Sequence, residues 1–185
     1  MKNKKKQCFI ICILFSIVIV GVASAIMKVN IKYKNPKQIY IEKGKPYAMD
    51  EKFMLTVQST SFLEPKEMLE KYKEVLDLSG QYESKGIEVK VTIKNITNQE
   101  QQVELYKLYL ESNTHYCNGM ALEMFLCNGN DEVAYALKPG EETQIILPYE
   151  LSQVQFSKTE WANIEDTKFY LVNERYPNKL YWCIR

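Results

Sequence analysis

The sequence Gly86-Ile-Glu-Val-Lys-Val-Thr-Ile-Lys-Asn-Ile-Thr97 carries the clearest structural pattern in the chain. Four apolar residues occupy its odd positions: Ile87, Val89, Val91 and Ile93. Charged or hydroxyl side chains lie between them, which gives the two-residue period of a strand with one face buried and one face in water. The pattern therefore predicts a half-buried antiparallel strand, and the remaining strands are expected to build onto its apolar face.

Short apolar runs separated by turn residues predict further strands on both sides of this one. They lie at residues 38–42, 52–60, 103–111, 133–137, 143–147, 168–172 and 180–184. Pro139 and Gly140 suit the central positions of a type II turn, and Pro148 is expected to close the strand before it. Within 103–111 the apolar positions change face, which indicates a bulge or a strand covered on both sides. About eight short strands are typical of an antiparallel β-sandwich.

One helix is predicted to interrupt the strands, from Pro65 to about Asp77. Proline suits a first helical position, and an apolar stripe follows at Met68, Leu69, Tyr72, Val75 and Leu76. The stripe either docks a partner or covers an open end of the sandwich. The second interpretation is favoured, because a narrow stripe normally packs on its own domain.

A shorter helical turn is predicted nearer the carboxyl terminus. Ser157-Lys-Thr-Glu160 has the form of a capping box, in which the serine and glutamate side chains satisfy the free backbone N–H groups of a helix start. The turn is expected to carry Trp161 and Ile164.

The amino terminus predicts insertion into a lipid bilayer. Residues 8–27 contain no charge and would span about 30 Å as a helix, the thickness of the hydrocarbon layer. The segment also divides like a signal peptide, with a small-residue cleavage site after Ala25. An uncleaved anchor is favoured, because the apolar run continues to Met27. The expected organisation is an anchor or signal (1–27), a basic linker (28–37) and a sandwich domain (38–185) outside the cell membrane, or secreted if cleaved.

Charge excludes one class of partner. The 185 residues carry a formal net charge of +1, but four lysines precede the apolar run at positions 2, 4, 5 and 6. Without them, 20 basic residues remain against 23 acidic ones. A nucleic-acid binder normally has a basic face, so no nucleic-acid partner is expected.

These features together resemble a known group of domains. They are the apolar leader, the strand Phe53–Val57, the pattern Gly-x-x-Val-x-Val-x-Ile-x-Asn at Gly86–Asn95, and Leu-x-Pro-Gly-Glu at Leu137–Glu141. The sequence resembles the uncharacterised extracytoplasmic immunoglobulin-like domains of Gram-positive bacteria. The resemblance implies an immunoglobulin-like sandwich that is membrane-anchored or secreted, and it implies no catalytic residues.

The cysteines leave alternatives open. Each of Cys117 and Cys127 begins a Cys-Asn-Gly tripeptide, and in an exported domain a bridge between them would stabilise by roughly 3 kcal/mol. Cys183 could instead pair with either one, or all three could be buried thiols. His115 with Cys117 and Cys127 matches no standard zinc spacing, so no metal and no cofactor is predicted.

The expected function is binding without turnover. Candidate partner-binding residues are aromatic or lie on the apolar helical stripe: Met68, Tyr72, Tyr176 and Tyr181. The bilayer is the expected partner of residues 8–27, and an envelope protein, a peptide or a glycan could be the ligand. One alternative is a hydrolase of envelope polymers that uses clustered carboxylates. The other is a structural spacer, which predicts that no surface patch stands out.

Overall fold

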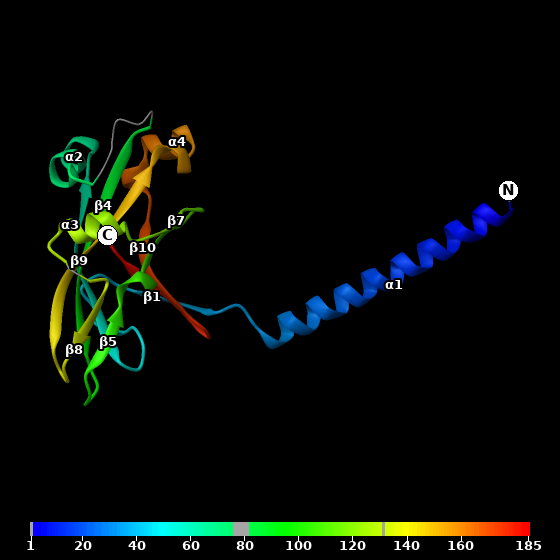
Figure 1. The fold of residues 1–185 in the computed structure, drawn as a ribbon, viewed down its shortest axis with the longest axis horizontal. Helices are drawn as coiled ribbons and strands as arrows, with labels where there is room; N and C mark the ends of the chain where they lie inside the picture. The colour runs from blue at the N-terminus through cyan, green and yellow to red at the C-terminus, as the bar shows by residue number, and fades with distance from the viewer. Residues whose placement is uncertain (1, 76–81, 131) are drawn as a thin grey trace. The chain divides into compact units, whose positions relative to one another are not determined.

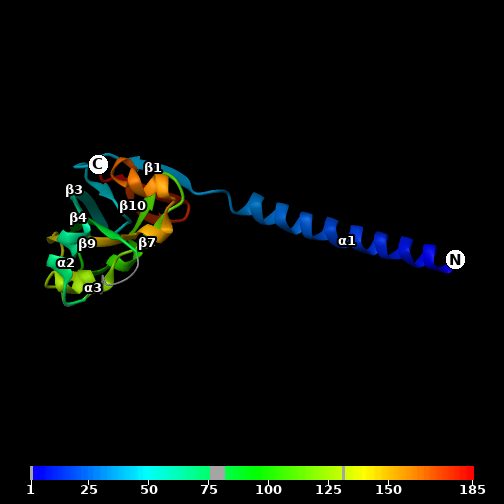
Figure 2. The same ribbon diagram turned by 90° about the horizontal axis from the view of Figure 1, so that it is seen from above.

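The computed structural model describes residues 2–75, 82–130 and 132–185, with side chains throughout these ranges except at 2–14 and 174–175. The chain divides into two compact units, Met1–Pro36 and Lys37–Arg185. Figures 1 and 2 show a single helix in the first unit and a β-rich domain in the second.

The first unit is the helix α1 (Lys2–Lys32). Its segment Phe15–Lys32 is long and apolar enough to cross a membrane, and none of it is buried. A helix whose apolar side chains are exposed on all sides suits a lipid environment. The helix continues past Met27, so residues 28–32, which were predicted to belong to the linker, are helical.

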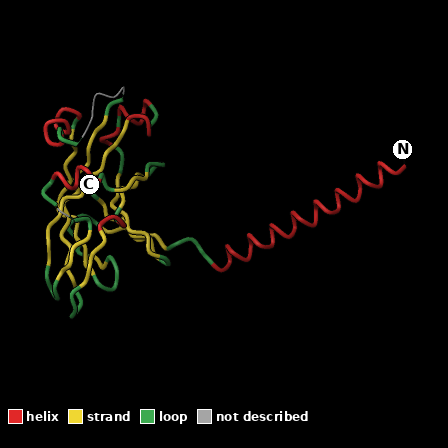
Figure 3. The backbone as a smooth tube through the Cα atoms, viewed as in Figure 1, coloured by secondary structure: helices red, strands yellow, loops and turns green. Residues whose placement is uncertain are grey.

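The strands of the second unit form two large sheets and one small one, drawn in yellow in Figure 3. The four-stranded sheet has the order β2 (Tyr47–Ala48), β3 (Phe53–Leu63), β4 (Ser84–Asn95), β9 (Glu142–Ser152). The five-stranded sheet has the order β1 (Lys37–Ile41), β11 (Asn178–Cys183), β10 (Phe169–Arg175), β6 (Tyr109–Ser112), β7 (Cys117–Gly119). A small sheet pairs β5 (Gln101–Glu104) with β8 (Ala134–Leu137).

The strand predicted around Ile87–Ile93 is confirmed as β4, which lies between β3 and β9. Its four apolar side chains are completely buried. They share one core cluster with apolar residues of both large sheets, for example Leu55, Leu147, Leu171 and Trp182. The two sheets therefore enclose the core as a sandwich, and the predicted mainly-β fold is confirmed.

One strand pairing differs from the predicted antiparallel arrangement. β1 pairs with β11 in parallel, with Lys37 opposite Asn178 and Ile41 opposite Trp182. A parallel neighbour needs a long connection, and here nearly the whole domain lies between the two strands. Buried and exposed side chains alternate along a strand in the same way whether its neighbour runs parallel or antiparallel to it. The sequences of β1 and β11 therefore do not indicate this pairing.

Two other strand predictions were wrong in detail. Residues 103–111 do not form one strand, because a 3₁₀ turn at Leu105–Lys107 separates β5 from β6, and these strands belong to different sheets. The turn explains the change of apolar face. Pro148 does not end its strand but lies inside β9. A proline, which has no backbone N–H, fits there because β9 is an edge strand. The backbone groups on one of its sides have no neighbouring strand with which to form hydrogen bonds.

The predicted helix is confirmed as α2 (Pro65–Tyr72), but it is shorter than expected. Residues 76 and 77 lie outside the described residues. Met68 and Tyr72 are buried, whereas Leu69 is 46% exposed. Met68 packs so closely on β4 that a Cβ added to Gly86 would lie 3.3 Å from it. The stripe thus packs on its own domain.

The helix covers the outer face of the four-stranded sheet and not an open end. Gly86 and Glu88 alternate with the core residues of β4, so their side of the strand points away from the core. The Tyr72 hydroxyl and the Lys71 ammonium both donate to the buried Glu88 carboxylate. Burial and the bond to Glu88 raise the pKa of Tyr72.

The type II turn and the capping box predicted from the sequence are both confirmed, and a helix is found in a segment for which the sequence predicted no element. Gly140 has φ +74° and Glu141 N–H donates to the Lys138 carbonyl, as a type II turn requires. The capping box at Ser157 starts α4 (Lys158–Ala162), which carries Trp161; Ile164 lies in the following 3₁₀ turn. The apolar run before Cys127 forms α3 (Leu122–Cys127).

We expect Ile93→Ala to lower the free energy of unfolding by about 2–5 kcal/mol, because it removes a buried side chain from the central strand. Lys94→Ala changes the next residue on the same strand, whose side chain is exposed, and should cost no more than about 0.5 kcal/mol. Urea unfolding of the full chain in detergent, followed by tryptophan fluorescence, measures both. Equal losses would contradict the burial assigned to Ile93.

Candidate functional site

The outer face of the five-stranded sheet gathers aromatic and charged side chains. Leu171, Leu180 and Trp182 point into the core, so their neighbours along β10 and β11 point outward. The register places Tyr40 opposite Tyr181. Six residues define what we call the tyrosine face: Tyr40 (β1), Tyr109 and Glu111 (β6), Tyr170 (β10), Lys179 and Tyr181 (β11).

Three tyrosines on this face contact one another. The rings of Tyr40 and Tyr181 are stacked, with centroids 4.9 Å apart and planes at 17°. Tyr170 meets both of them edge-on, at 5.5 Å from Tyr40 and 5.6 Å from Tyr181. These are the favourable geometries for aromatic pairs. Tyr40 remains 57% exposed, so one side of its ring rests on Tyr181 and the other faces outward.

An ion pair occupies the centre of the face. The Lys179 ammonium lies 2.8 Å from the Glu111 carboxylate, which also accepts a hydrogen bond of 3.2 Å from the Tyr181 hydroxyl. The ammonium lies over the rings of Tyr109 and Tyr181, 5.8 and 5.3 Å from their centroids. Burial by itself lowers the pKa of Lys179, but the hydrogen bonds to Glu111 and Tyr181, together with the electrostatic attraction of Tyr109 and Glu111, outweigh it, and the net shift is upward. The ammonium and the carboxylate thus form an ion pair in which the two charges offset each other.

A pocket of about 480 Å³ adjoins the tyrosine face. It shares three residues with the face and adds five from β6, β7 and the turn between them: Tyr109, Glu111, Lys179, Ser112, Thr114, His115, Tyr116 and Cys117. Its size falls in the range of small-molecule sites. Because the shared residues line both, the face and the pocket form one continuous surface.

The hydroxyl groups of the pocket have defined partners. Ser112 Oγ lies 2.9 Å from Thr114 Oγ1 and accepts from the Tyr116 backbone N–H. The Tyr116 hydroxyl donates to the Glu150 carbonyl at 2.7 Å, and burial raises the pKa of Tyr116. The His115 ring is exposed at the rim, with Nε2 3.2 Å from the Gln155 carbonyl oxygen. Tyr116 thus builds the pocket floor, while Thr114 and His115 remain accessible at its edge.

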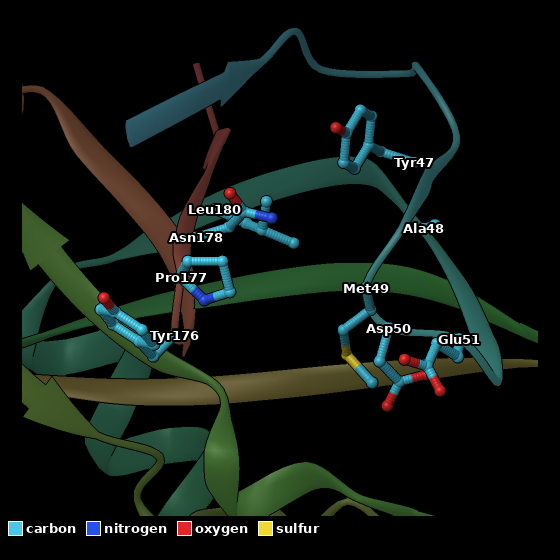
Figure 4. A pocket seen from close by; sticks show the side chains of 9 residues that line it. All are labelled: Tyr47, Ala48, Met49, Asp50, Glu51, Tyr176, Pro177, Asn178 and Leu180. Atoms are coloured by element: carbon cyan, nitrogen blue, oxygen red, sulfur yellow. The ribbon is translucent and has the colours of Figure 1, made fainter. Parts of the chain in front are cut away.

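A second hollow, of about 400 Å³, lies near the β10–β11 turn and is shown in Figure 4. Tyr47 and Tyr176 lie on opposite sides of it, and Asp50 and Glu51 also line it. Asp50 Oδ1 accepts the backbone N–H groups of Lys52 and Phe53 at 2.7 and 2.8 Å. Its carboxylate therefore caps a turn, so a binding role for this hollow has less support.

The structure separates the four predicted partner-binding residues. Tyr181 belongs to the tyrosine face, and Tyr176 lies at the turn beside the second hollow. Met68 and Tyr72 are buried beneath α2 with Met124, so they contact their own domain. No sequence pattern pointed to Tyr40, Tyr109 or Lys179, because only the pairing of β1, β11, β10 and β6 brings them together.

Of the alternatives that the sequence left open for the cysteines, the bridge between Cys117 and Cys127 is not formed in this structure. Cys127 is a free, exposed thiol at the end of α3, and Cys183 is also free. Cys117 lines the pocket. Within the part of the chain that the structure describes, no three His, Cys, Asp or Glu side chains are placed to hold a metal ion.

Comparison with known families assigns the chain. The model of the family DUF5028, described as a domain of unknown function, matches residues 31–180. The chain belongs to this family. A search of curated proteins finds no match.

Two solved structures are similar to this DUF5028 protein. One is an uncharacterised β-sandwich protein from Clostridium difficile, with 17% identity and a TM-score of 0.46 over 82% of this chain and 97% of the other. The second is a conserved hypothetical protein from Bacillus anthracis, with 16% identity and a TM-score of 0.46 over 74% of this chain and 92% of the other. The family description names no ligand, so function has to be argued from the site itself.

We expect Glu111→Gln to destabilise the domain by about 1–2 kcal/mol near neutral pH, because it removes the charge that holds the half-buried Lys179. A lysine with a raised folded-state pKa contributes this stability below its unfolded-state pKa, about 10.4, and loses it as the pH rises toward the folded-state value. The difference in melting temperature between wild type and variant should therefore be constant from about pH 7 to 9 and shrink above about pH 10.5. A difference in melting temperature that stays the same above about pH 10.5 would contradict the stabilising role of the Lys179–Glu111 ion pair.

Proposed function

We propose that this DUF5028 protein is a membrane-anchored, extracytoplasmic binding module that holds its ligand on the tyrosine face. The observation that carries the proposal is the stacked tyrosine cluster, in which Tyr40 presents an open ring to solvent beside a neutralised ion pair and an adjoining pocket. Tyrosine supplies a large, rigid contact area that loses little conformational freedom on binding. Such a surface is suited to recognition.

The anchor is supported by α1. The helix is apolar over Phe15–Lys32 and leaves its large side chains exposed. Lysines precede its apolar stretch and no acidic residue does, which is the layout of a segment that exports the domain after it. Export by this segment would display the sandwich outside the cell.

Binding is favoured over hydrolysis by the composition of the pocket. Glycoside hydrolysis with two carboxylates requires both beside the scissile bond. Among the described residues that line this pocket, Glu111 is the one acidic side chain, and its carboxylate already accepts from Lys179 and Tyr181. A pure spacer, in turn, has no use for an aromatic ring that is exposed above a packed aromatic cluster, as Tyr40 is.

Binding to an isolated envelope fraction tests the proposal. We expect the full chain in lipid nanodiscs to sediment with the fraction, and Tyr40→Ala to weaken this binding at least tenfold, which corresponds to about 1.4 kcal/mol. Tyr106→Ala is the matched control, because Tyr106 is also a tyrosine, is 56% exposed and lies away from the face, on the 3₁₀ turn.

Two results would contradict the proposed site. One is equal binding by wild type and Tyr40→Ala. The other is an equal loss in both tyrosine variants, since that would indicate a general effect of removing exposed aromatic area. Melting temperatures of the two variants show whether either substitution disturbs the fold.

Thiol labelling tests the orientation. Cys117 and Cys127 are exposed, so a membrane-impermeant maleimide should label the full chain in intact cells as strongly as in permeabilised cells. In intact cells the double variant Cys117→Ser/Cys127→Ser should lose the label, because Cys183 is half-buried and the two other cysteines, Cys8 and Cys12, lie in the apolar amino-terminal segment. Labelling that requires permeabilisation would place the domain in the cytosol and overturn the proposed location.

A further inference from the structure

We infer that the ligand of the tyrosine face is a neutral, extended β-1,4-linked glycan, which binds across the strands from Tyr40 to the pocket beside β7. This inference rests on the proposed binding function and names its ligand class. Three properties of the surface support it: the open aromatic ring, the cancelled charge and the polar pocket at the far side of the face.

The aromatic property concerns the ring of Tyr40. The face of an aromatic ring is electron-rich, and the flat side of a pyranose presents C–H groups that carry a small positive charge. The Tyr181 ring stacks against one side of the Tyr40 ring, with centroids 4.9 Å apart, and the Tyr170 ring meets Tyr40 edge-on. The ring is thus held in one orientation before a sugar arrives, which reduces the entropy lost on binding.

The charge property separates neutral from anionic polymers. A polymer with phosphate or carboxylate groups gains most from cations that are available to pair with it. The cation at the centre of this face, Lys179, is already paired at 2.8 Å with Glu111, and the pair is largely shielded, with 17% and 23% of the two side chains exposed. Breaking it to bind an anion would leave a half-buried carboxylate without its partner. A neutral ligand meets no such cost.

The polar property concerns hydrogen bonds. Each hydroxyl group of a sugar can donate one hydrogen bond and accept others. The pocket offers matching groups of mixed character: the Thr114 hydroxyl, the His115 ring, and the lone pairs of Glu111 that Lys179 and Tyr181 do not use. The two ring nitrogens of His115 lie 3.2 Å from the Gln155 carbonyl oxygen and 3.5 Å from the Glu160 carboxylate. Tyr109 lies where the face meets the pocket. One sugar unit can therefore stack on Tyr40 while another places its hydroxyls in the pocket.

The dimensions favour an extended chain. Neighbouring strands lie roughly 4.8 Å apart, so the five strands from β1 to β7 span about 19 Å. A single sugar cannot bridge this distance, whereas a β-1,4-linked chain of equatorial pyranoses is a flat ribbon that can. An α-1,4-linked chain curves away from a sheet surface. A peptide, by contrast, would gain most by pairing along an open strand edge, such as that of β1 or β7, and there it would run along the strands and not across the tyrosines.

Saturation-transfer-difference NMR with defined sugars tests the inference on the full chain in nanodiscs. The probes are the neutral sugars cellotetraose and tetra-N-acetylchitotetraose, with maltotetraose as the α-linked control and poly-L-glutamate as the anionic control. We expect saturation of protein resonances to reach the ring protons of at least one β-1,4 tetramer, and little transfer to either control. Tyr40→Ala should weaken binding of that tetramer at least tenfold, Tyr40→Phe should retain it, and Tyr106→Ala should leave it unchanged.

The outcomes separate this inference from the proposed function. If Tyr40-dependent binding to envelope fractions is found but neither β-1,4 tetramer binds, the ligand class is wrong and the binding function stands. If poly-L-glutamate or maltotetraose binds as well as the tetramers, the inference is also overturned. If neither the envelope fraction nor a tetramer binds, both proposals fail. Because Tyr40 is exposed at a sheet edge, its variants should fold, and their melting temperatures verify this.

Discussion

The domain depends on burying one side of two β-sheets against each other. Ile87, Val89, Val91 and Ile93 of β4 are fully buried because the opposite sheet supplies Trp182 and its apolar neighbours. This burial is the main favourable term in folding. It also fixes the register of every strand that contributes to it, because a slip by one residue would turn the apolar side chains out to water.

The tyrosine face is a consequence of that register. Since side chains alternate along a strand, placing Leu180 and Trp182 in the core obliges Lys179 and Tyr181 to point outward. The same holds for Tyr40 on β1. Once the strands are paired, the outward residues become neighbours, and their stacking and ion pairing add stability to a face that the core has already positioned. A binding surface can therefore be carried by the same rigid sheet that stabilises the domain.

The outer faces of the two sheets have different surroundings. On the four-stranded sheet, α2 and α3 cover the outer side, and the buried Glu88 is satisfied by Lys71 and Tyr72. The predicted partner-binding residues Met68 and Tyr72 are engaged in this packing. On the five-stranded sheet the outward tyrosines pack against one another instead. An apolar stripe in a sequence cannot by itself show whether a helix packs on its own domain or docks a partner.

Local sequence was sufficient to predict the strand character of β4, the type II turn at Pro139–Gly140, the capping box at Ser157 and the long apolar helix α1. Each of these depends on residues close together in the chain, where period, backbone preference and length act locally. The parallel pairing of β1 with β11, the place of Pro148 inside an edge strand and the assembly of the tyrosine face emerged only in the folded domain. These features join residues that are far apart in sequence, and which strands become neighbours is settled by the packing of the whole core.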